Sequence, residues 1–374
     1  MTRMLRWLLT AWCCAAIGGC ATSDGDTGRP GLSAADARTL IVRLLPPNLP
    51  DRGGWAADIY AAFATQDIAA TTENICAVLA VTEQESTFRS DPPVPGLASI
   101  AWQEIDRQAD RAGVPRFAVH AALRLTSSNG KSYSERIDAA TTEKQLSEIF
   151  EDFISMVPLG KTFLASRNPV RTGGPMQVSI AFAEDQAAAA RYPYPVEHSI
   201  RHEVFTRRGG MYFGIAHLLG YEAPYSQPLY RFADFNAGRY ASRNAAFQNA
   251  LSIASGVPLV LDGDLLPPGA KPETPTGSTE LAALAFAKRL DMTAAAIRRD
   301  LERGTEAGFE RTRLYERVFA RADQANGRPV PRAVLPAIDL KSPKIKRKLT
   351  TEWFARRVDE RYQRCTSRVS QQSG

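Results

Sequence analysis

Thr72-Glu-Asn-Ile-Cys-Ala-Val-Leu-Ala-Val-Thr-Glu-Gln-Glu-Ser-Thr-Phe88 is the stretch that decides the fold, and its apolar spacing predicts one amphipathic helix. At about 100° per residue, the apolar side chains share one side of that helix. They are Ile75, Val78, Leu79, Val81 and Phe88. Glu85 falls within the same arc, whereas Glu83 falls largely outside it. The pattern therefore predicts that the helix buries the Glu85 carboxyl group and leaves Glu83 pointing away.

Glu85 becomes a candidate for acid catalysis only together with two later segments of the chain, and its apolar neighbours suit that role. A carboxyl group among apolar side chains is disfavoured in its charged form, so we expect its pKa to rise. A general acid acting on a glycosidic oxygen needs a proton that it still holds near neutral pH. On this helical pattern alone, we interpret Glu85 as a structural glutamate that caps a neighbouring loop.

Two later segments accompany Glu85-Ser-Thr-Phe88 in chain order. The first is the turn-like Gly174-Pro-Met-Gln177, and the second is Phe232-Ala-Asp-Phe-Asn-Ala-Gly238, which follows Gly209-Gly-Met-Tyr-Phe213. Together the segments resemble the signature of the soluble lytic transglycosylases, whose core is lysozyme-like. Those enzymes carry Glu-Ser-x-Phe at the end of a helix, then Gly-Leu-Met-Gln, then Ala-Tyr-Asn-Ala-Gly. The resemblance covers roughly residues 73–249, apart from an insertion.

The resemblance implies a mainly α fold with a lysozyme-like core, and cleavage of the glycan strands of peptidoglycan. It implies Glu85 as the catalytic acid, with no metal and no organic cofactor. It also implies a set of side chains that contact the sugar: Ser86, Met176, Gln177, Tyr212, Phe235 and Asn236.

Three positions depart from the family's pattern. Pro175 stands where the family has Leu, and Asp234 replaces a small residue. Phe235 replaces a Tyr whose hydroxyl lies near the catalytic glutamate in the family. We interpret Asp234 as a surface acid on a helix, with a second catalytic carboxylate as the alternative. The hydroxyl missing at Phe235 keeps a second class of function open, that of a non-catalytic glycan-binding, uptake or structural outer-membrane lipoprotein.

The first nineteen residues predict a signal peptide, which has no part in the fold. Their apolar run, Leu8–Ile17, is too short to span a bilayer. It ends in Ile17-Gly-Gly-Cys20, which resembles the lipobox of bacterial lipoproteins, so we expect Cys20 to carry lipid and residues 20–32 to form a tether. Ala21 is not acidic, which favours the outer membrane over the inner one. The whole chain also resembles a family of uncharacterised proteobacterial outer-membrane lipoproteins, particularly over Leu340–Cys365.

The charge and the cysteines are consistent with an exported protein. Removal of the signal peptide takes away Arg3 and Arg6 and no acid, so the formal net charge falls from +6 to +4. A polyanionic envelope surface accounts for this sign without a nucleic-acid partner. Besides Cys20, the mature chain keeps Cys76 and Cys365, in a compartment that permits disulfides. A bridge between them and two free buried thiols are both open.

The mature chain is predicted to hold a lysozyme-like domain over 33–256, with a helical insertion at about 91–172. A connector rich in Pro and Gly follows over 257–278, and a helical C-terminal region over 279–374. Periodicity and capping residues predict further helices at 33–44, 51–65, 102–112, 116–125, 142–156, 281–303, 305–325 and 350–364. Short strands are expected at 176–182 and 257–261.

One competing constellation is His198-Ser-Ile-Arg-His202, which places two imidazoles at i and i+4 with Glu197 and Glu203 beside them. Such a pair can bind zinc. However, no glutamate lies inside the pair, so the metalloprotease arrangement is absent. We interpret the two histidines as a surface pair and predict no metal site.

Overall fold

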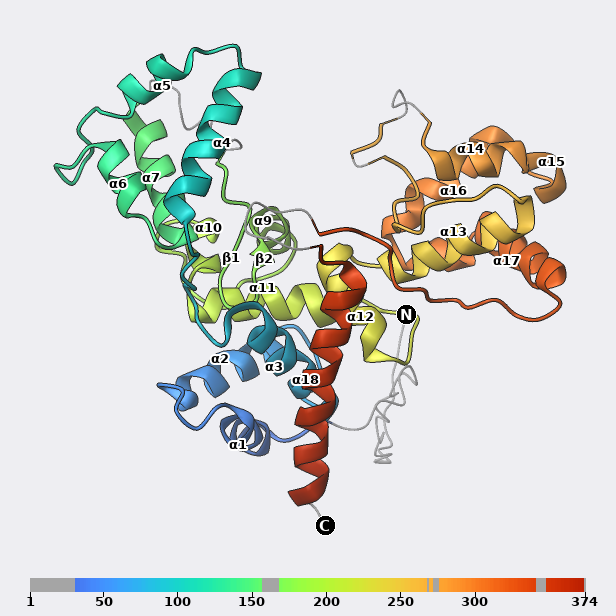
Figure 1. Cartoon of the computed structure of the whole chain (residues 1–374). Coiled ribbons are helices and arrows are strands. Elements are labelled where there is room, and N and C mark those ends of the chain that lie inside the picture. Colours follow the sequence, from blue (N-terminus) through green and yellow to red (C-terminus); the bar gives the residue numbers. More distant parts are fainter. Residues whose placement is uncertain (1–30, 157–167, 268, 272–275, 341–347, 373–374) are drawn as a thin grey trace, which may run out of the picture. The chain divides into compact units, whose positions relative to one another are not determined.

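The computed structural model describes residues 31–156, 168–267, 269–271, 276–340 and 348–372, and this described chain is mainly helical, as predicted (Figure 1). The elements of its first half are α1 (Ala34–Leu44), α2 (Arg52–Thr65), α3 (Thr72–Ser86), α4 (Leu97–Arg111), α5 (Arg116–Ala122), α6 (Tyr133–Ala139), α7 (Glu143–Met156), β1 (Thr172–Gly173), β2 (Val178–Ser179) and α9 (Ile180–Ala189). Those of the second half are α10 (Ile200–Val204), α11 (Arg207–Leu219), α12 (Pro228–Ala237), α13 (Ala241–Ser255), α14 (Ser278–Ala285), α15 (Ala287–Leu290), α16 (Ala294–Glu302), the 3₁₀ helices η2 (Arg303–Thr305) and η3 (Ala307–Arg311), α17 (Arg313–Asn326) and α18 (Thr351–Gln372).

Hydroxyl side chains mark where several of these helices begin. Ser33, Thr71, Thr206 and Thr312 each accept a hydrogen bond from the backbone N–H three residues later, at the starts of α1, α3, α11 and α17. The first N–H groups of a helix have no partner within the helix, so a side-chain acceptor at this position favours the start there. For α1 and α3 the observed starts are close to the predicted ones, whereas α17 starts at Arg313 and not at residue 305.

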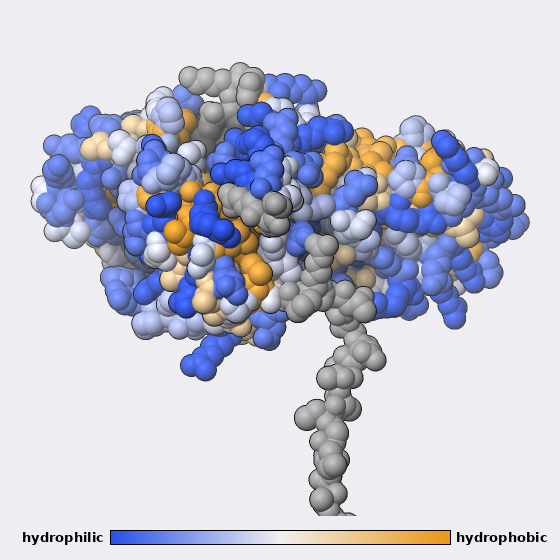
Figure 2. All heavy atoms as spheres, turned by 90° about the horizontal axis from the view of Figure 1, so that it is seen from below, coloured by the Kyte–Doolittle hydropathy of each residue, from blue (hydrophilic) through white to orange (hydrophobic). Residues whose placement is uncertain are grey.

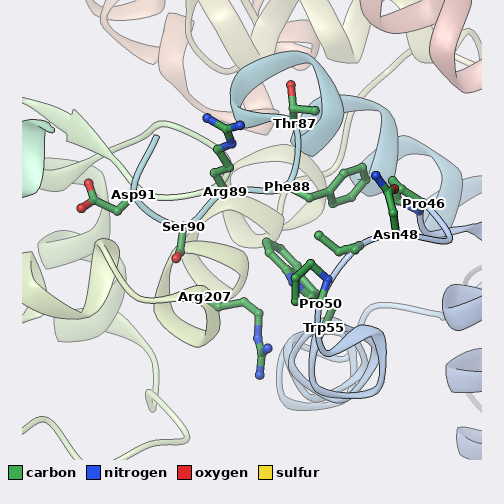
Figure 3. Close-up of a pocket in the computed structure, with 11 residues that line it drawn as sticks. Pro46, Asn48, Pro50, Trp55, Thr87, Phe88, Arg89, Ser90, Asp91 and Arg207 are labelled. Atoms are coloured by element: carbon green, nitrogen blue, oxygen red, sulfur yellow. The ribbon is translucent and has the colours of Figure 1, made fainter. Parts of the chain in front are cut away.

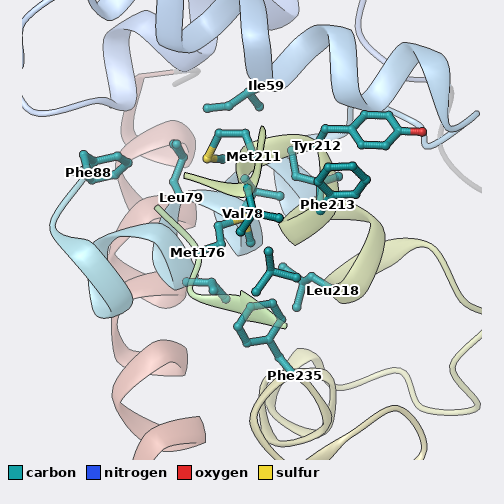
Figure 4. Packing of buried hydrophobic residues seen from close by; sticks show 14 of the residues in the cluster. Ile59, Val78, Leu79, Phe88, Met176, Met211, Tyr212, Phe213, Leu218 and Phe235 are labelled. Carbon is teal, nitrogen blue, oxygen red and sulfur yellow. The ribbon is translucent and has the colours of Figure 1, made fainter. Parts of the chain in front are cut away.

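The first core gathers apolar side chains from α1, α2, α3, α11, α12 and α18, and from the helices of the predicted insertion (Figure 4). Helix α11 is buried along nearly its whole length, from Gly209 to Ala216. Helix α3 contributes the continuous buried run Ile75–Thr82. Helix α18 returns from the far end of the chain to pack against α3 and α12. Burial of this amount of apolar surface is the main stabilising contribution to the fold.

A second core is formed by α13, α14, α16 and α17. Its aromatic rings meet edge to face or tilted, with centroids 5.1 Å apart for Phe247 and Phe309 and 4.5 Å apart for Tyr315 and Phe319. The fully buried Arg243 side chain donates a hydrogen bond to the Gly304 carbonyl at 2.6 Å. The guanidinium therefore satisfies backbone groups where the chain turns sharply at η2.

The two cores divide the chain at places other than the predicted boundaries. Helix α13 lies in the predicted lysozyme-like domain but contributes to the second core, whereas α18 lies in the predicted C-terminal region but belongs to the first. The predicted connector, 257–278, packs onto α13, where Gln248 Nε2 donates to Asp262 Oδ1 at 2.7 Å. This segment is therefore part of the second core.

Both predicted strands are wrong, apart from two residues. Within 176–182 only Val178–Ser179 pairs as a strand, because Ser179 Oγ accepts from the Phe182 N–H at 3.4 Å and starts α9. Within 257–261, which the structure describes in full, there is no strand. The predicted helix 281–303 is also interrupted, since Asp291 has a φ of 49° and Thr293 then caps α16.

The surface of the described chain is mainly hydrophilic on the face shown in Figure 2, with separate hydrophobic patches. Among the described helices, none combines the length and the apolar character that crossing a membrane requires. The predicted signal peptide, Cys20 and most of the tether lie outside the described residues.

Candidate functional site

Glu85 lies in the last turn of α3 and is partly buried. The helix ends directly after it, because Thr87 and Phe88 both adopt left-handed backbone conformations, with φ of 51° and 58°. Two successive non-glycine residues in this region cost free energy, and such strain clusters at functional sites. The strained turn points the chain away from the axis of α3 immediately after Glu85.

Ser86 stabilises this turn. Its hydroxyl donates to the Thr82 carbonyl at 3.2 Å and accepts from the Arg89 N–H at 3.2 Å. The side chain is 6% exposed. Both hydrogen-bonding functions of Ser86 are therefore used within the protein, so its predicted contact with a sugar requires these bonds to open.

The second motif forms the turn that joins β1 and β2, which confirms the predicted tight turn. Gln177 closes it with its N–H donating to the Gly174 carbonyl at 3.1 Å, and its side-chain Nε2 donates to the same carbonyl at 3.1 Å. Gln177 also has a positive φ, 49°. Gly174 has a φ of 74°, and a Cβ there would lie 2.1 Å from the Val204 carbonyl oxygen, so only glycine fits.

Helix α11 packs against the second motif and against α3, the helix whose end carries the first motif (Figure 4). A Cβ on Gly210 would meet Pro175 at 2.3 Å, and one on Gly214 would meet Met176 at 2.4 Å, so these glycines let the turn lie directly on the helix. On another side of α11, the Thr82 hydroxyl of α3 lies 3.8 Å from the Met211 sulfur. The close packing explains why Met176 is completely buried.

The third motif packs on α11 through an aromatic contact. The rings of Phe235 and His217 have centroids 5.1 Å apart, and His217 Nε2 donates to the Phe235 carbonyl at 3.1 Å. Phe182 covers the imidazole from another direction, at 4.8 Å. Burial lowers the pKa of His217 to about 4. The imidazole is therefore neutral at physiological pH, and its buried Nδ1 has no hydrogen-bond partner among the described residues.

Asp234 is fully buried, so its interpretation as a surface acid is wrong. Its carboxylate accepts hydrogen bonds from the Tyr221 hydroxyl at 2.9 Å, from the Tyr225 hydroxyl, and from the N–H groups of Tyr240 and Ser242 at 3.0 and 2.7 Å. The two N–H groups belong to the start of α13. Asp234 therefore caps the next helix from within α12, which is a structural role.

The polar groups of two further predicted sugar-binding residues are also occupied. The Tyr212 hydroxyl donates to the Arg191 carbonyl at 3.1 Å, and the side chain is 1% exposed. Asn236 Oδ1 accepts from the Thr351 hydroxyl at 2.9 Å, which ties α12 to the start of α18. Tyr212 and Asn236 thus hold the first core together.

The structure therefore separates the predicted site residues into two groups. Met176, Tyr212 and Phe235 are buried by the packing around α11, so they offer little or no surface to a ligand. Glu85 and Gln177 remain partly exposed. Asn236 is exposed, so Glu85, Gln177 and Asn236 are the predicted residues that could reach a bound molecule.

A groove of about 640 Å³ lies beside the end of α3 (Figure 3). It is lined by Pro46, Asn48, Leu49, Pro50, Trp55, Arg207 and the five residues after Ser86, namely Thr87, Phe88, Arg89, Ser90 and Asp91. Phe88 points toward Pro46 and Asn48, whereas Arg89 points away from them. Glu85 lies two residues before Thr87, the first of these five lining residues.

The groove contains residues that sequence reasoning missed. The rings of Trp55 and Phe88 meet edge to face at 5.8 Å, and the Arg207 guanidinium lies 5.8 Å from the Trp55 ring. Arg207 is paired with Asp51 at 2.7 Å and with Asp58 at 2.5 Å. Trp55 and Arg207 lie far from the Glu-Ser-Thr-Phe motif in sequence, so no local spacing could have assigned them to it.

Glu83 contacts α18. Its Oε1 lies 3.3 Å from Arg361 Nε and 3.7 Å from Arg364 Nη2, and its side chain is 42% exposed. These ion pairs agree with the helical phase that places Glu83 outside the apolar arc. They give Glu83 a surface role that does not involve the groove.

Cys76 and Cys365 form a disulfide, with their Cα atoms 5.6 Å apart. It joins α3 to α18 across 289 residues of sequence. Of the two alternatives that the sequence left open, the structure contains the bridge. The helix that carries Glu85 is thus tied covalently to the last helix of the chain.

The two histidines of the competing constellation lie together, with ring centroids 5.1 Å apart. His202 Nδ1 lies 3.0 Å from the Ser199 hydroxyl and 3.7 Å from Glu151. In the part of the chain that the structure describes, no group of three or more His, Cys, Asp and Glu side chains is arranged to hold a metal ion.

Comparisons with known proteins identify relatives without an assigned activity. The family described as "Protein of unknown function (DUF1615)" matches residues 48–368. The chain is 54% identical over 349 residues to "Uncharacterized protein YaiW" of Escherichia coli (strain K12), a match that spans 93% of this chain and 94% of that protein. No solved structure matches this chain.

Proposed function

This chain belongs to the DUF1615 family of proteins of unknown function, and we propose that it cleaves the glycan strands of peptidoglycan as a lytic transglycosylase-like enzyme with a lysozyme-like core. Glu85 is the proposed catalytic acid. The observation that carries this proposal is that the second and third motif segments pack on α11, which also contacts α3, the helix that ends in the first motif. A resemblance carried by separate segments supports a shared site more strongly when those segments pack on the same helix.

The position of Glu85 suits acid catalysis. It ends a helix whose preceding residues, Ile75–Thr82, are all buried, and it stays partly exposed itself. A carboxyl group between an apolar core and a groove can hold a proton and still reach a ligand. The turn at Thr87 and Phe88 sets where the helix ends beside the groove, and the disulfide at Cys76 ties the first half of the same helix to α18.

The proposed reaction uses one carboxyl group in two roles. Glu85 first donates its proton to the glycosidic oxygen, and the bond to the departing sugar breaks. As a carboxylate it then accepts the proton of the 6-hydroxyl group on the remaining sugar, whose oxygen attacks the anomeric carbon and closes an anhydro ring. Unlike hydrolysis by paired carboxylates, this route requires no second acid. The protons balance, and Glu85 is restored.

Gln177 is the second residue with a proposed role toward the substrate. Its Nε2 is used by the Gly174 carbonyl, and no group of the described chain donates to its Oε1. That oxygen can accept a hydrogen bond from a sugar hydroxyl or N-acetyl group. Ser86, Met176, Tyr212 and Phe235 are buried and stabilise the surrounding packing, whereas the exposed Asn236 is a third candidate for contact with the sugar.

Glycan binding without cleavage is the second candidate, and the environment of Phe235 favours it. This ring packs on His217 and supplies no hydroxyl group where the resembled enzymes have one. A protein of this kind would hold peptidoglycan from an outer-membrane anchor.

We also propose the location. The lipobox-like Ile17-Gly-Gly-Cys20 supports a lipid on Cys20. The protein would then be a lipoprotein anchored in the outer membrane. The domain would follow a polar tether.

Purified protein incubated with insoluble peptidoglycan separates the two candidates. The enzyme releases soluble fragments with anhydro-muramyl ends, which mass spectrometry detects. A glycan-binding protein co-sediments with the peptidoglycan and releases nothing. If the protein neither sediments with peptidoglycan nor releases fragments, both candidates are wrong.

A further inference from the structure

Helix α5 is unusual in that none of its residues is buried. Helices in proteins are stabilised mainly by packing of an apolar face, and a helix of seven residues is too short to be stable alone. Polar contacts hold α5 to α4 instead. Arg116 Nε donates to Asp110 Oδ1 at 2.9 Å, and His120 Nε2 lies 2.7 Å from Asp106 Oδ1.

The apolar side chains around α5 face solvent. Phe117 is 78% exposed, Leu125 53% and Val114 41%. Single exposed apolar residues are ordinary. Here three large ones lie within twelve residues, on and beside a helix whose only apolar packing against the core is by the half-buried Val119, and they indicate a surface that contacts another phase or molecule. In Figure 1, α5 lies at the end of α4 that is farther from β1 and β2.

The same segment is strongly basic. Residues 107–131, called here the basic tip, hold five Lys and Arg residues and one Asp, a formal net charge of +4, whereas the whole chain carries +6. Arg107 pairs with Glu104, and Arg116 pairs with Asp110. Arg111 and Arg124 are exposed, and among the described residues neither has an acidic partner.

We propose that the basic tip binds the surface of an anionic phospholipid bilayer. Exposed aromatic and aliphatic side chains enter the boundary between headgroups and acyl chains, while arginines remain at the phosphates. Each Lys or Arg near an anionic membrane adds about 1 kcal/mol of attraction. Phe117 with Arg111 and Arg124 supplies both kinds of contact. This inference is independent of the proposed action on peptidoglycan.

The test is co-sedimentation with vesicles. The protein is the mature chain, exported behind a cleavable signal peptide, with Cys20→Ala so that no lipid of its own inserts. One set of vesicles is phosphatidylcholine alone, and in the other about a third of the lipid is phosphatidylglycerol, the anionic component that the proposal requires. We expect sedimentation with the anionic vesicles only, and weaker sedimentation as salt rises.

Two variants and two matched controls locate the binding surface. Phe117→Ser should weaken binding about tenfold or more, because a buried Phe side chain contributes that much. The double variant Arg111→Gln with Arg124→Gln should weaken it about 30-fold at low salt. Val260→Ser changes a residue that is 65% exposed elsewhere, and Arg313→Gln with Arg321→Gln removes the same charge from α17; neither should weaken binding comparably.

All of these side chains are exposed, so thermal melting should show the same stability for each variant. Equal binding to neutral and anionic vesicles, no binding to either, or unchanged binding of the two tip variants would each overturn the proposal. Loss of binding only in the α17 control would assign the membrane contact to α17 instead.

Discussion

Glu83 and Glu85 differ by about 200° in direction around the axis of α3. Glu83 points to Arg361 and Arg364 of α18, whereas Glu85 ends the helix beside the groove. Because the Glu83 side chain is 42% exposed, its ion pairs contribute less than about 1 kcal/mol to stability. Glu83→Gln is therefore a suitable control for any substitution of Glu85.

His217 makes a testable contribution to the pH dependence of stability. Burial lowers its pKa in the folded protein to about 4, below the ordinary value of about 6.5 that it has when unfolded. Protonation therefore favours unfolding. The contribution is complete above about pH 6.5 and is lost as the pH falls toward 4, with about 2 kcal/mol gone at about pH 4.5.

Urea unfolding at neutral pH and near pH 4.5 measures this effect. His217→Gln keeps a donor for the Phe235 carbonyl but has no imidazole to titrate, so its stability should fall less than that of the wild type between the two conditions. Equal losses in the two proteins would show that His217 does not titrate on unfolding.

Asp234 is predicted to be a stability residue. Asp234→Ala leaves two tyrosine hydroxyls and two N–H groups of the α13 start without their acceptor. We expect a loss of about 3–4 kcal/mol in the free energy of unfolding, and a smaller one for Asp234→Asn, which keeps one acceptor oxygen. Denaturant unfolding beside the exposed control Glu316→Gln checks this. An unchanged midpoint for Asp234→Ala would contradict the capping role.

At the residue scale, local patterns predict what lies on one helix and miss contacts between elements. The phase of α3 separates Glu83 from Glu85 in direction, and Glu83 contacts α18, but both side chains are half-buried. Asp234 could not be placed in this way, because its partners are the tyrosines before α12 and the start of α13, and no spacing within α12 shows them.

At the scale of the elements, the disulfide joins α3 to α18. Replacing both Cys76 and Cys365 by Ala should lower stability by about 2–5 kcal/mol, since the bridge closes a very long loop in the unfolded chain. Thermal unfolding of the double variant should show this loss, and reduction should lower the melting temperature of the wild type but not of the variant. Equal melting of the oxidised and reduced wild type would contradict the role of the bridge.

Capping chemistry explains which elements could be predicted. Ser33 and Thr71 stand at the starts of helices whose positions the sequence indicates well, whereas the cap at Thr312 was overlooked and that helix was predicted to start at residue 305. The strand predicted over 176–182 failed because a short apolar run fits a strand and a helix equally. There Ser179 decides the outcome as the cap of α9.

At the scale of the whole molecule, the chain leaves the first core, forms a second one and returns. Pro and Gly residues over 257–278 predicted a connector, yet this segment packs on α13 through Gln248. The return of α18 to α3 could not be predicted from periodicity, which shows that α18 has an apolar face but not which helix covers it.

The lipid anchor also belongs to this scale. Cys20→Ala removes the proposed acceptor, so the protein should move from the membrane fraction to the soluble periplasmic fraction, as detected by fractionation and immunoblotting. Cys76→Ala, which alters a cysteine of the folded domain, should leave the location unchanged. A Cys20→Ala protein that stays in the membrane fraction would place the anchor elsewhere.

The most direct test of the central claim is mass spectrometry of the products that the mature protein releases from peptidoglycan. The account predicts anhydro-muramyl ends from the wild type and from Glu83→Gln. Glu85→Gln should lower their release about 100-fold or more, since it keeps the shape of the side chain but has no transferable proton. The variant should still fold and still sediment with peptidoglycan. No anhydro ends from the wild type, or undiminished release by Glu85→Gln, would contradict the claim that Glu85 is the catalytic acid.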